Sequence, residues 1–210
     1  MTFVEIQNKV LALMDESGDT GTILENTKTF INSALKNRAM ERKWPFMLSD
    51  EVTLTVLAGE TTVSLPTDFA TMHWIKDSNN QLLLQMPLEN RFIDGWDDMT
   101  LYGRGDYVIY GSVIKFLTLE EGHSGYTFTC QYYKVPADLV DDADEPDFPT
   151  QFHDLLVWDA VIGLKGYHAE LDNIEYLLEQ QRRGEQRLYV SNFGSDSVGQ
   201  IPRTVRYVGP

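Results

Sequence analysis

The sequence predicts an α+β fold: a helical bundle built from both ends of the chain, with an antiparallel β-sandwich or barrel-like domain inserted between them. Apolar residues recur every three or four positions near both ends, which is the period of a helix. They alternate at every second position in the middle, which is the period of a strand. We expect a bundle from 1–48 and 149–190, a β domain with an acidic linker over 49–148, and an extended C-terminal arm over 191–210.

The N-terminal part predicts two helices, over residues 2–14 and 22–43. Each begins with a capping box, at Thr2 to Glu5 and at Thr22 to Glu25, in which the two side chains satisfy free backbone amides. The second helix ends before Pro45, because proline disfavours helical geometry at the preceding residue. Three cations near that end are predicted to complement the helix dipole: Arg38, Arg42 and Lys43.

The middle of the chain predicts seven short strands, a number typical of an antiparallel sandwich or barrel. Val52–Val56 and Thr62–Leu65 alternate on either side of a turn at Ala58-Gly59-Glu60 and read as a β-hairpin. Five further strands are expected, at 72–76, 81–85, 107–110, 113–119 and 126–133. A short helix is expected over 88–96 and a loop over 103–106.

The C-terminal part predicts a long helical segment that pauses near 170–173 and continues to about Val190. Thr150, next to Pro149, is its expected N-cap. We interpret Gly163 and Gly166 as places where the backbone of another helix comes close. One apolar stripe is predicted along the segment: Leu156, Ala160, Leu164, Tyr167, Leu171, Ile174 and Leu178.

The net charge of −15 is unevenly distributed. Five arginines against two carboxylates give the chain from Arg182 onward a charge of +3, which leaves −18 for the rest. An acidic body argues against wrapping nucleic acid, because affinity for phosphates depends on clustered Lys and Arg. A basic C-terminal part could fit an acidic partner or could be a solvated face.

The sequence predicts no catalytic, cofactor-binding or metal-binding residues. His153-Asp154 lacks the further ligands that a metal site needs, and the acidic run 138–147, expected to be a solvated loop, lacks the calcium-loop pattern. Gly103-x-Gly105 is no phosphate loop, and Cys130 is expected to be a buried thiol. The absence of an apolar h-region and of a long apolar run predicts a soluble protein made in a cytoplasm, with no membrane partner.

Between residues 30 and 165 the sequence resembles the head-to-tail adaptors of tailed bacteriophages. The motifs that carry the resemblance are Asn32-Ser33-Ala34-Leu35 with Glu41-Arg42-Lys43-Trp44-Pro45-Phe46, then Val63-Ser64-Leu65-Pro66-Thr67-Asp68-Phe69, then Tyr132-Tyr133-Lys134-Val135-Pro136 with Asp147-Phe148-Pro149 and Phe152-His153-Asp154-Leu155-Leu156.

The resemblance implies a structural virion protein at the head-to-tail junction. It implies a homo-oligomeric ring, a 12-mer, that binds the portal protein and a distal tail protein such as a nozzle or tail tube. DNA passes through the ring without being tightly bound. A C-terminal arm is implied to lie against the portal, and we predict its contacts as Arg182, Arg183, Arg187, Ile201, Arg203, Val205, Arg206, Tyr207 and Val208.

Two other functions remain open from the residues alone. A β-sandwich binding module with helical flanks would suit a tail or fibre component. A tail-associated hydrolase would need an acid/base or metal constellation, and the sequence does not provide one.

Overall fold

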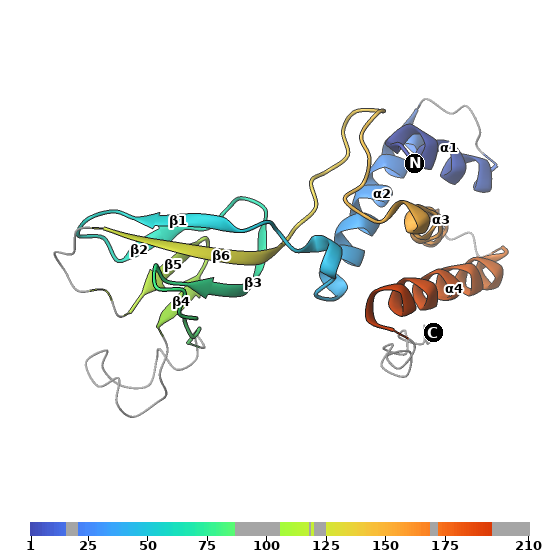
Figure 1. Cartoon of the computed structure of the whole chain (residues 1–210). Coiled ribbons are helices and arrows are strands. Elements are labelled where there is room, and N and C mark those ends of the chain that lie inside the picture. The colour runs from blue at the N-terminus through green and yellow to red at the C-terminus, as the bar shows by residue number, and fades with distance from the viewer. Residues whose placement is uncertain (16–20, 87–105, 118, 120–124, 169–171, 195–210) are drawn as a thin grey trace, which may run out of the picture. The chain divides into compact units, whose positions relative to one another are not determined.

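The computed structural model describes residues 1–15, 21–86, 106–117, 119, 125–168 and 172–194. Among these residues it contains four α-helices and two antiparallel three-stranded sheets, as the predicted α+β class requires (Figure 1). The chain divides into a helical unit, Met1–Met47 with Pro136–Pro210, and a β unit, Leu48–Val135. The short helix expected over 88–96 and residues 103–105 of the expected loop lie outside the described residues.

The helical unit is organised around its third helix. Its helices are α1 (Phe3–Leu13), α2 (Thr22–Glu41), α3 (His153–His168) and α4 (Ile174–Phe193). α3 packs against each of the other three, and in Figure 1 it lies between α2 and α4. No helix among the described residues is long and apolar enough to cross a membrane.

The helix starts show which local signals the fold uses. At α1 the capping box is confirmed: the Glu5 amide donates to Thr2 Oγ1 at 3.4 Å, and the Thr2 amide donates to Glu5 Oε2 at 2.9 Å. The second box is wrong, because Thr22 is already helical and the N-cap is Gly21, which has no capping side chain. Glu25 instead pairs with Lys28.

Thr150 is not the N-cap of α3. A 3-10 turn, Thr150–Phe152, precedes the helix and is closed by the Phe152 amide, which donates to the Pro149 carbonyl at 2.8 Å. The Thr150 side chain is therefore not needed to satisfy a helical amide. At the other end of the unit, α4 extends to Phe193, so residues 191–193 of the expected arm are helical, while 195–210 lie outside the described residues.

The predicted apolar stripe fails in the last turn of α3 and again on α4, and one of its members, Leu171, lies outside the described residues. Leu156, Ala160 and Leu164 are fully buried, but Tyr167 is 67% exposed and Leu178 is 45% exposed. The chain is interrupted at Asn173, which has a left-handed φ of 61°, so α4 starts with a new rotational phase. α4 buries a different set of side chains: Leu177, Glu185, Leu188 and Tyr189.

Neither glycine of α3 faces another helix backbone. A Cβ at Gly163 would lie 2.6 Å from Cδ1 of Phe30, so the close neighbour is an aromatic side chain of α2. A Cβ at Gly166 would meet nothing within 4 Å. The prediction of close backbone approach is therefore wrong at both positions, and only Gly163 is required by packing.

The β unit contains two sheets, with strand orders β1-β6-β3 and β2-β5-β4. The first is built from β1 (Val52–Val56), β6 (Tyr126–Lys134) and β3 (Phe69–Lys76). The second is built from β2 (Thr62–Ser64), β5 (Val113–Phe116) and β4 (Tyr107–Tyr110).

The predicted hairpin of β1 and β2 is wrong. The turn between them exists, because the Glu60 amide donates to the Leu57 carbonyl at 3.1 Å, but it leads from one sheet into the other. β1 pairs with β6, and β2 pairs with β5. The predicted strand over 81–85 is reduced to two isolated bridges, from Leu82 to Lys76 and from Gln85 to Tyr107.

Apolar side chains from both sheets form one core in the β unit. Phe116 and Phe128, on different sheets, stack with ring centroids 4.1 Å apart and an interplanar angle of 10°. Cys130 is fully buried, as predicted, and burial raises the pKa of its thiol to about 11. The other buried members of this core are Leu54, Val56, Leu65, Met72, Ile75, Tyr107, Ile114 and Tyr132.

Candidate interaction surface

The first and third motifs of the resemblance meet in one aromatic cluster of the helical unit. We define this aromatic cluster as Trp44, Phe46, Phe148, Tyr189 and Phe193. Trp44 is fully buried, and its ring centroid lies 5.3–5.5 Å from those of Phe46, Tyr189 and Phe193. Phe46 contacts Phe148 edge-on at 5.2 Å. These motif residues therefore hold the end of α4 against the segment that follows α2.

The second motif meets the start of the third inside the β unit. The Tyr132 hydroxyl donates to Asp68 Oδ1 at 2.8 Å, and the Val135 amide donates to the Asp68 carbonyl at 2.7 Å. The Phe69 and Tyr132 rings lie 5.5 Å apart. Burial, with the Asp68 carboxylate, raises the pKa of Tyr132 to about 12. The motif residues thus fix strand ends and supply no reactive group.

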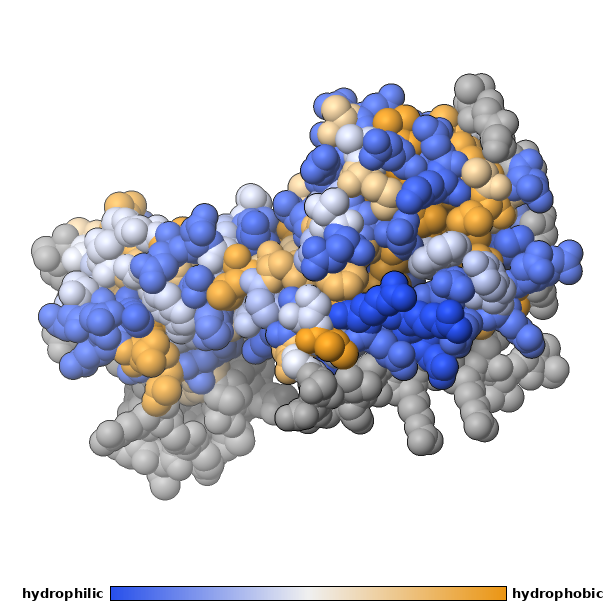
Figure 2. All heavy atoms as spheres, turned by 45° about the vertical axis from the view of Figure 1, so that its right-hand side comes forward, coloured by the Kyte–Doolittle hydropathy of each residue, from blue (hydrophilic) through white to orange (hydrophobic). Residues whose placement is uncertain are grey.

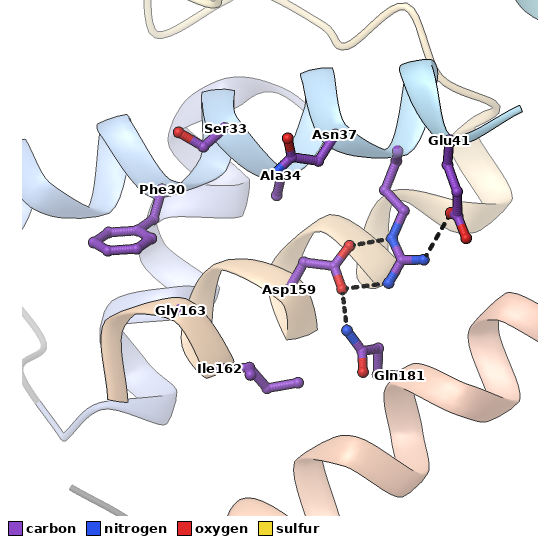
Figure 3. A pocket seen from close by; sticks show the side chains of 10 residues that line it. Phe30, Ser33, Ala34, Asn37, Glu41, Asp159, Ile162, Gly163 and Gln181 are labelled. Carbon is purple, nitrogen blue, oxygen red and sulfur yellow. Dashed lines mark hydrogen bonds and ion pairs between the residues drawn. The ribbon is translucent and has the colours of Figure 1, made fainter. Parts of the chain in front are cut away.

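A buried ion-pair cluster joins three helices around Arg38 (Figure 3). Its guanidinium binds Asp159 of α3 through Nε at 2.5 Å and Nη2 at 2.7 Å. Nη1 contacts Glu185 of α4 at 2.6 Å and Glu41 at 3.2 Å, and Gln181 Nε2 donates to Asp159 Oδ1 at 2.7 Å. Burial opposes the charge of Arg38, but the three carboxylates outweigh it and raise its pKa. Burial raises the pKa of Glu185.

Arg38 lies in the last turn of α2, as predicted, but its guanidinium also forms ion pairs with three carboxylates. Its side chain is only 10% exposed and serves as the cation of the interhelical cluster. Local sequence could not reveal this, because Asp159 follows 121 residues later.

An open pocket of about 470 Å³ lies beside the ion-pair cluster, between α2, α3 and α4 (Figure 3). Phe30, Ala34, Ile162 and Gly163 supply its apolar wall. The carboxylates at its polar end already accept hydrogen bonds or ion pairs from Arg38 and Gln181. Across the described ranges, no group of three or more His, Cys, Asp or Glu side chains is arranged to hold a metal ion. The pocket is a packing feature of the three helices.

His153 is a buried structural residue. Its Nδ1 lies 2.8 Å from the amino group of Met1, and its Nε2 lies 2.7 Å from the Phe148 carbonyl. This geometry fits a neutral ring that accepts at Nδ1 and donates from Nε2. Burial lowers the pKa of His153, and the nearby amino group acts in the same direction. Asp154 points elsewhere and pairs with Lys9 at 2.8 Å.

The acidic run 138–147 is anchored along its backbone, although most of its carboxylates are exposed. Asn32 exchanges two hydrogen bonds with the backbone of Leu139, at 2.8 and 3.0 Å. The Asp144 carboxylate accepts from the amides of Val140 and Asp141, and these bonds lower its pKa. The Asp144 carbonyl accepts from the Phe3 amide at 2.7 Å, which satisfies the start of α1. The carboxylates of the run are solvated, as predicted, and its backbone is hydrogen-bonded to α1 and α2.

Three of the predicted portal contacts lie on the exposed side of α4. Arg182 and Arg183 both pair with Glu179, at 3.2 and 2.9 Å. Arg187 is exposed and forms no ion pair with any residue the structure describes. The remaining predicted contacts lie outside the described residues: Ile201, Arg203, Val205, Arg206, Tyr207 and Val208.

Comparison with known proteins agrees with the resemblance carried by these motifs. The sequence model of the SU10 adaptor protein family matches residues 1–204, which include almost the whole of both units. No match to a curated protein was found. The chain therefore belongs to the SU10 adaptor protein family, a family of bacteriophage head-to-tail adaptors.

Proposed function

We propose that the chain forms a twelve-membered ring on the portal protein and joins the capsid to the tail. The observation that carries this proposal is the family match over residues 1–204. Family membership supports a structural adaptor role, association with other head and tail proteins, and a location in the virion. The buried ionisable groups described above all have packing roles, which agrees with a protein that works by contact.

A ring subunit needs lateral surfaces that another copy can cover. The helical unit exposes several large apolar side chains, including Val140 at 74%, Tyr167 at 67% and Met40 at 66%. Figure 2 shows hydrophobic residues, in orange, among hydrophilic ones on the face of the molecule that it draws. Val140 lies in the acidic run 138–147, whose backbone is held by hydrogen bonds. Burying Val140 against a partner therefore costs little conformational entropy of the loop.

The C-terminal segment is the proposed portal contact. We assign to it Arg182, Arg183 and Arg187 on α4, followed by Ile201, Arg203, Val205, Arg206, Tyr207 and Val208. Ordering an extended segment costs about 1–2 kcal/mol per residue, so its apolar anchors must be buried on a partner to offset that cost. The arginines would then face acidic groups of the portal.

Deletion of residues 195–210 tests the portal contact. The cut lies beyond Gly194 so that α4 stays intact. The shortened protein should keep its thermal melt and lose co-sedimentation with preassembled portal rings. Unaltered portal affinity after the deletion would show that the helical unit alone makes the joint.

Electron microscopy of the protein with its portal tests the ring itself. Class averages should show twelve subunits beneath the portal, whereas the free protein should remain monomeric or weakly associated because its −15 charge opposes self-assembly. A stable dodecamer of the free protein, or labelling of the chain away from the head-to-tail junction, contradicts the proposal.

We also propose that the ring leaves a channel for DNA. Carboxylates presented to the channel would repel phosphates and let DNA pass without sticking. Binding of duplex DNA by the protein should be undetectable at micromolar concentration and physiological salt. Tight, salt-sensitive binding would exclude an acidic channel.

A further inference from the structure

The last turn of α4 rests on a buried tryptophan. Phe193 is the final helical residue and is 41% exposed, yet its ring lies 5.5 Å from that of Trp44 and 6.2 Å from that of Tyr189. An aromatic side chain at this position removes less apolar surface from water than a core residue does. Its contact with Trp44 nevertheless ties the end of α4 to the segment after α2.

The two rings that Phe193 contacts, those of Trp44 and Tyr189, are themselves held in place. Trp44 Nε1 donates to the Arg38 carbonyl at 2.7 Å, which sets the plane of the indole. The guanidinium of Arg42 lies 4.3 Å from the centre of the Tyr189 ring, a cation–π distance. Both rings that touch Phe193 are therefore held by residues of α2 or by the residue directly after it.

The chain leaves α4 directly after this contact. The Gly194 amide donates to the Val190 carbonyl at 3.0 Å, and Asn192 Nδ2 donates to the Leu188 carbonyl at 2.8 Å. Gly194 has a φ of +80°, which a side chain rarely adopts, so the helix stops at a defined residue. The start of the following segment is thus set by Phe193 and Gly194 together.

We propose that Phe193 is a positioning residue for the C-terminal segment: by packing its ring against Trp44, it fixes the point from which the segment leaves α4 towards the portal. This inference rests on the proposed function. A segment with a fixed start has fewer conformations to lose when it docks, and preorganisation of this kind raises affinity without a new contact. The same ring contact contributes little to the stability of a helix whose other anchors, Leu177 and Leu188, are already buried.

Portal affinity of full-length Phe193→Ala tests the inference. We expect about tenfold weaker binding to immobilised portal rings, mainly through faster dissociation, with a thermal melt close to that of the wild type. Phe193→Trp keeps an aromatic ring on Trp44 and should restore affinity. Phe193→Leu keeps an apolar side chain but removes the ring that contacts Trp44, and it should behave like the alanine variant.

Leu178→Ala is the matched control, because Leu178 is 45% exposed on the same helix and lies far from the aromatic cluster in sequence. It should leave both affinity and melt unchanged. Equal affinity of Phe193→Ala and the wild type, together with lost binding after deletion of 195–210, would overturn the positioning role and leave the portal contact intact. Full affinity after the deletion would overturn the portal contact itself. A large decrease in the melting temperature of Phe193→Ala, together with wild-type portal affinity at low temperature, would show that Phe193 acts only by stabilising the fold.

Discussion

The helical unit and the β unit bury different kinds of side chain. Among the residues that the structure describes, the buried polar groups of the helical unit are Gln7, Thr27, Arg38, His153 and Glu185, whereas Ser49 is the one in the β unit. In a sheet, backbone hydrogen bonds hold the strands together and the alternation of apolar side chains sets their register, so the core can be wholly apolar. Helices satisfy their own backbones and can rotate or slide against each other. We infer that the Arg38 ion-pair cluster sets the register of α2, α3 and α4.

The largest effect should come from Phe116→Ala. Phe116 is 1% exposed and stacks on Phe128, and truncation of a buried phenylalanine costs about 3–5 kcal/mol. Chemical denaturation, with hydrogen exchange as the readout for each unit, should show this loss of unfolding free energy in the β unit. Leu57→Ala, at a residue 61% exposed, is the control and should change stability little. A cost below about 1 kcal/mol for Phe116→Ala would mean that the two sheets do not share one core.

Arg38→Met should destabilise the helical unit by about 3 kcal/mol, because it leaves one buried and one partly buried carboxylate without their cation. Asp159 and Glu185 are the groups concerned. Lys28→Met breaks an exposed ion pair with Glu25 and should cost less than about 0.5 kcal/mol. Denaturation midpoints of both variants give the comparison.

A triple variant sharpens the same comparison. Arg38→Met with Asp159→Leu and Glu185→Leu replaces the ion-pair cluster by apolar groups and should recover much of the lost stability. If the cluster sets helix register, this variant should show broader NMR signals for α2–α4 than the wild type. Sharp, native-like spectra would contradict that role.

The two glycines of α3 should respond with opposite signs. Gly163→Ala places a methyl group against the Phe30 ring and should cost about 1–3 kcal/mol. Gly166→Ala adds a methyl group in open space and should stabilise α3 by up to about 1 kcal/mol through helix propensity. The melting temperatures of the two variants test this difference in sign. Equal shifts in melting temperature would show that Phe30 moves aside without cost.

The smallest effect should appear with pH. Burial lowers the pKa of His153 from an ordinary value of 6.5, so the unfolded chain binds a proton more readily than the folded one. Stability of the helical unit should therefore fall as pH drops through 6.5. Cys130 and Tyr132 have raised pKa values of about 11 and 12, so these two groups should lower the stability of the β unit as pH rises through their ordinary values of 9.0 and 10.0.

His153→Gln isolates the acid response. Glutamine keeps a donor and an acceptor but does not titrate, so the difference in stability between wild type and variant should shrink or reverse as pH is lowered from 7.5 to 5.5. Unfolding curves at several pH values measure that difference. A constant difference would show that His153 has the same pKa in the folded and unfolded chains.

Structural features that depend on neighbouring residues, such as helix caps and turns, can be predicted from the sequence. Contacts between segments that are far apart in the sequence cannot. The capping box of Thr2 and Glu5 is local and was predicted correctly. The turn after β1 was also local, but the partner of β1 is β6, which begins at Tyr126. A turn reverses the direction of the chain, but it does not determine which strand the next strand pairs with.

The same limit applies to the candidate surface. The arginines of α4 stand out in the sequence by charge, and their contact with the portal stays a prediction. Trp44 belongs to a motif that carries the resemblance, but its packing with Phe193 depends on the path of α4, which starts after Asn173. No local sequence pattern predicts which face of α4 packs against the other helices.

The buried thiol of the β unit offers a way to observe this molecule inside a particle. Cys130 is the single cysteine of the chain, and it lies on the central strand of its sheet, fully shielded. A maleimide reagent can reach it only when β6 is uncovered, so the labelling rate measures how often the β unit opens. Applied to whole virions before and after DNA release, one chemical modification would show whether the junction loosens as the genome leaves.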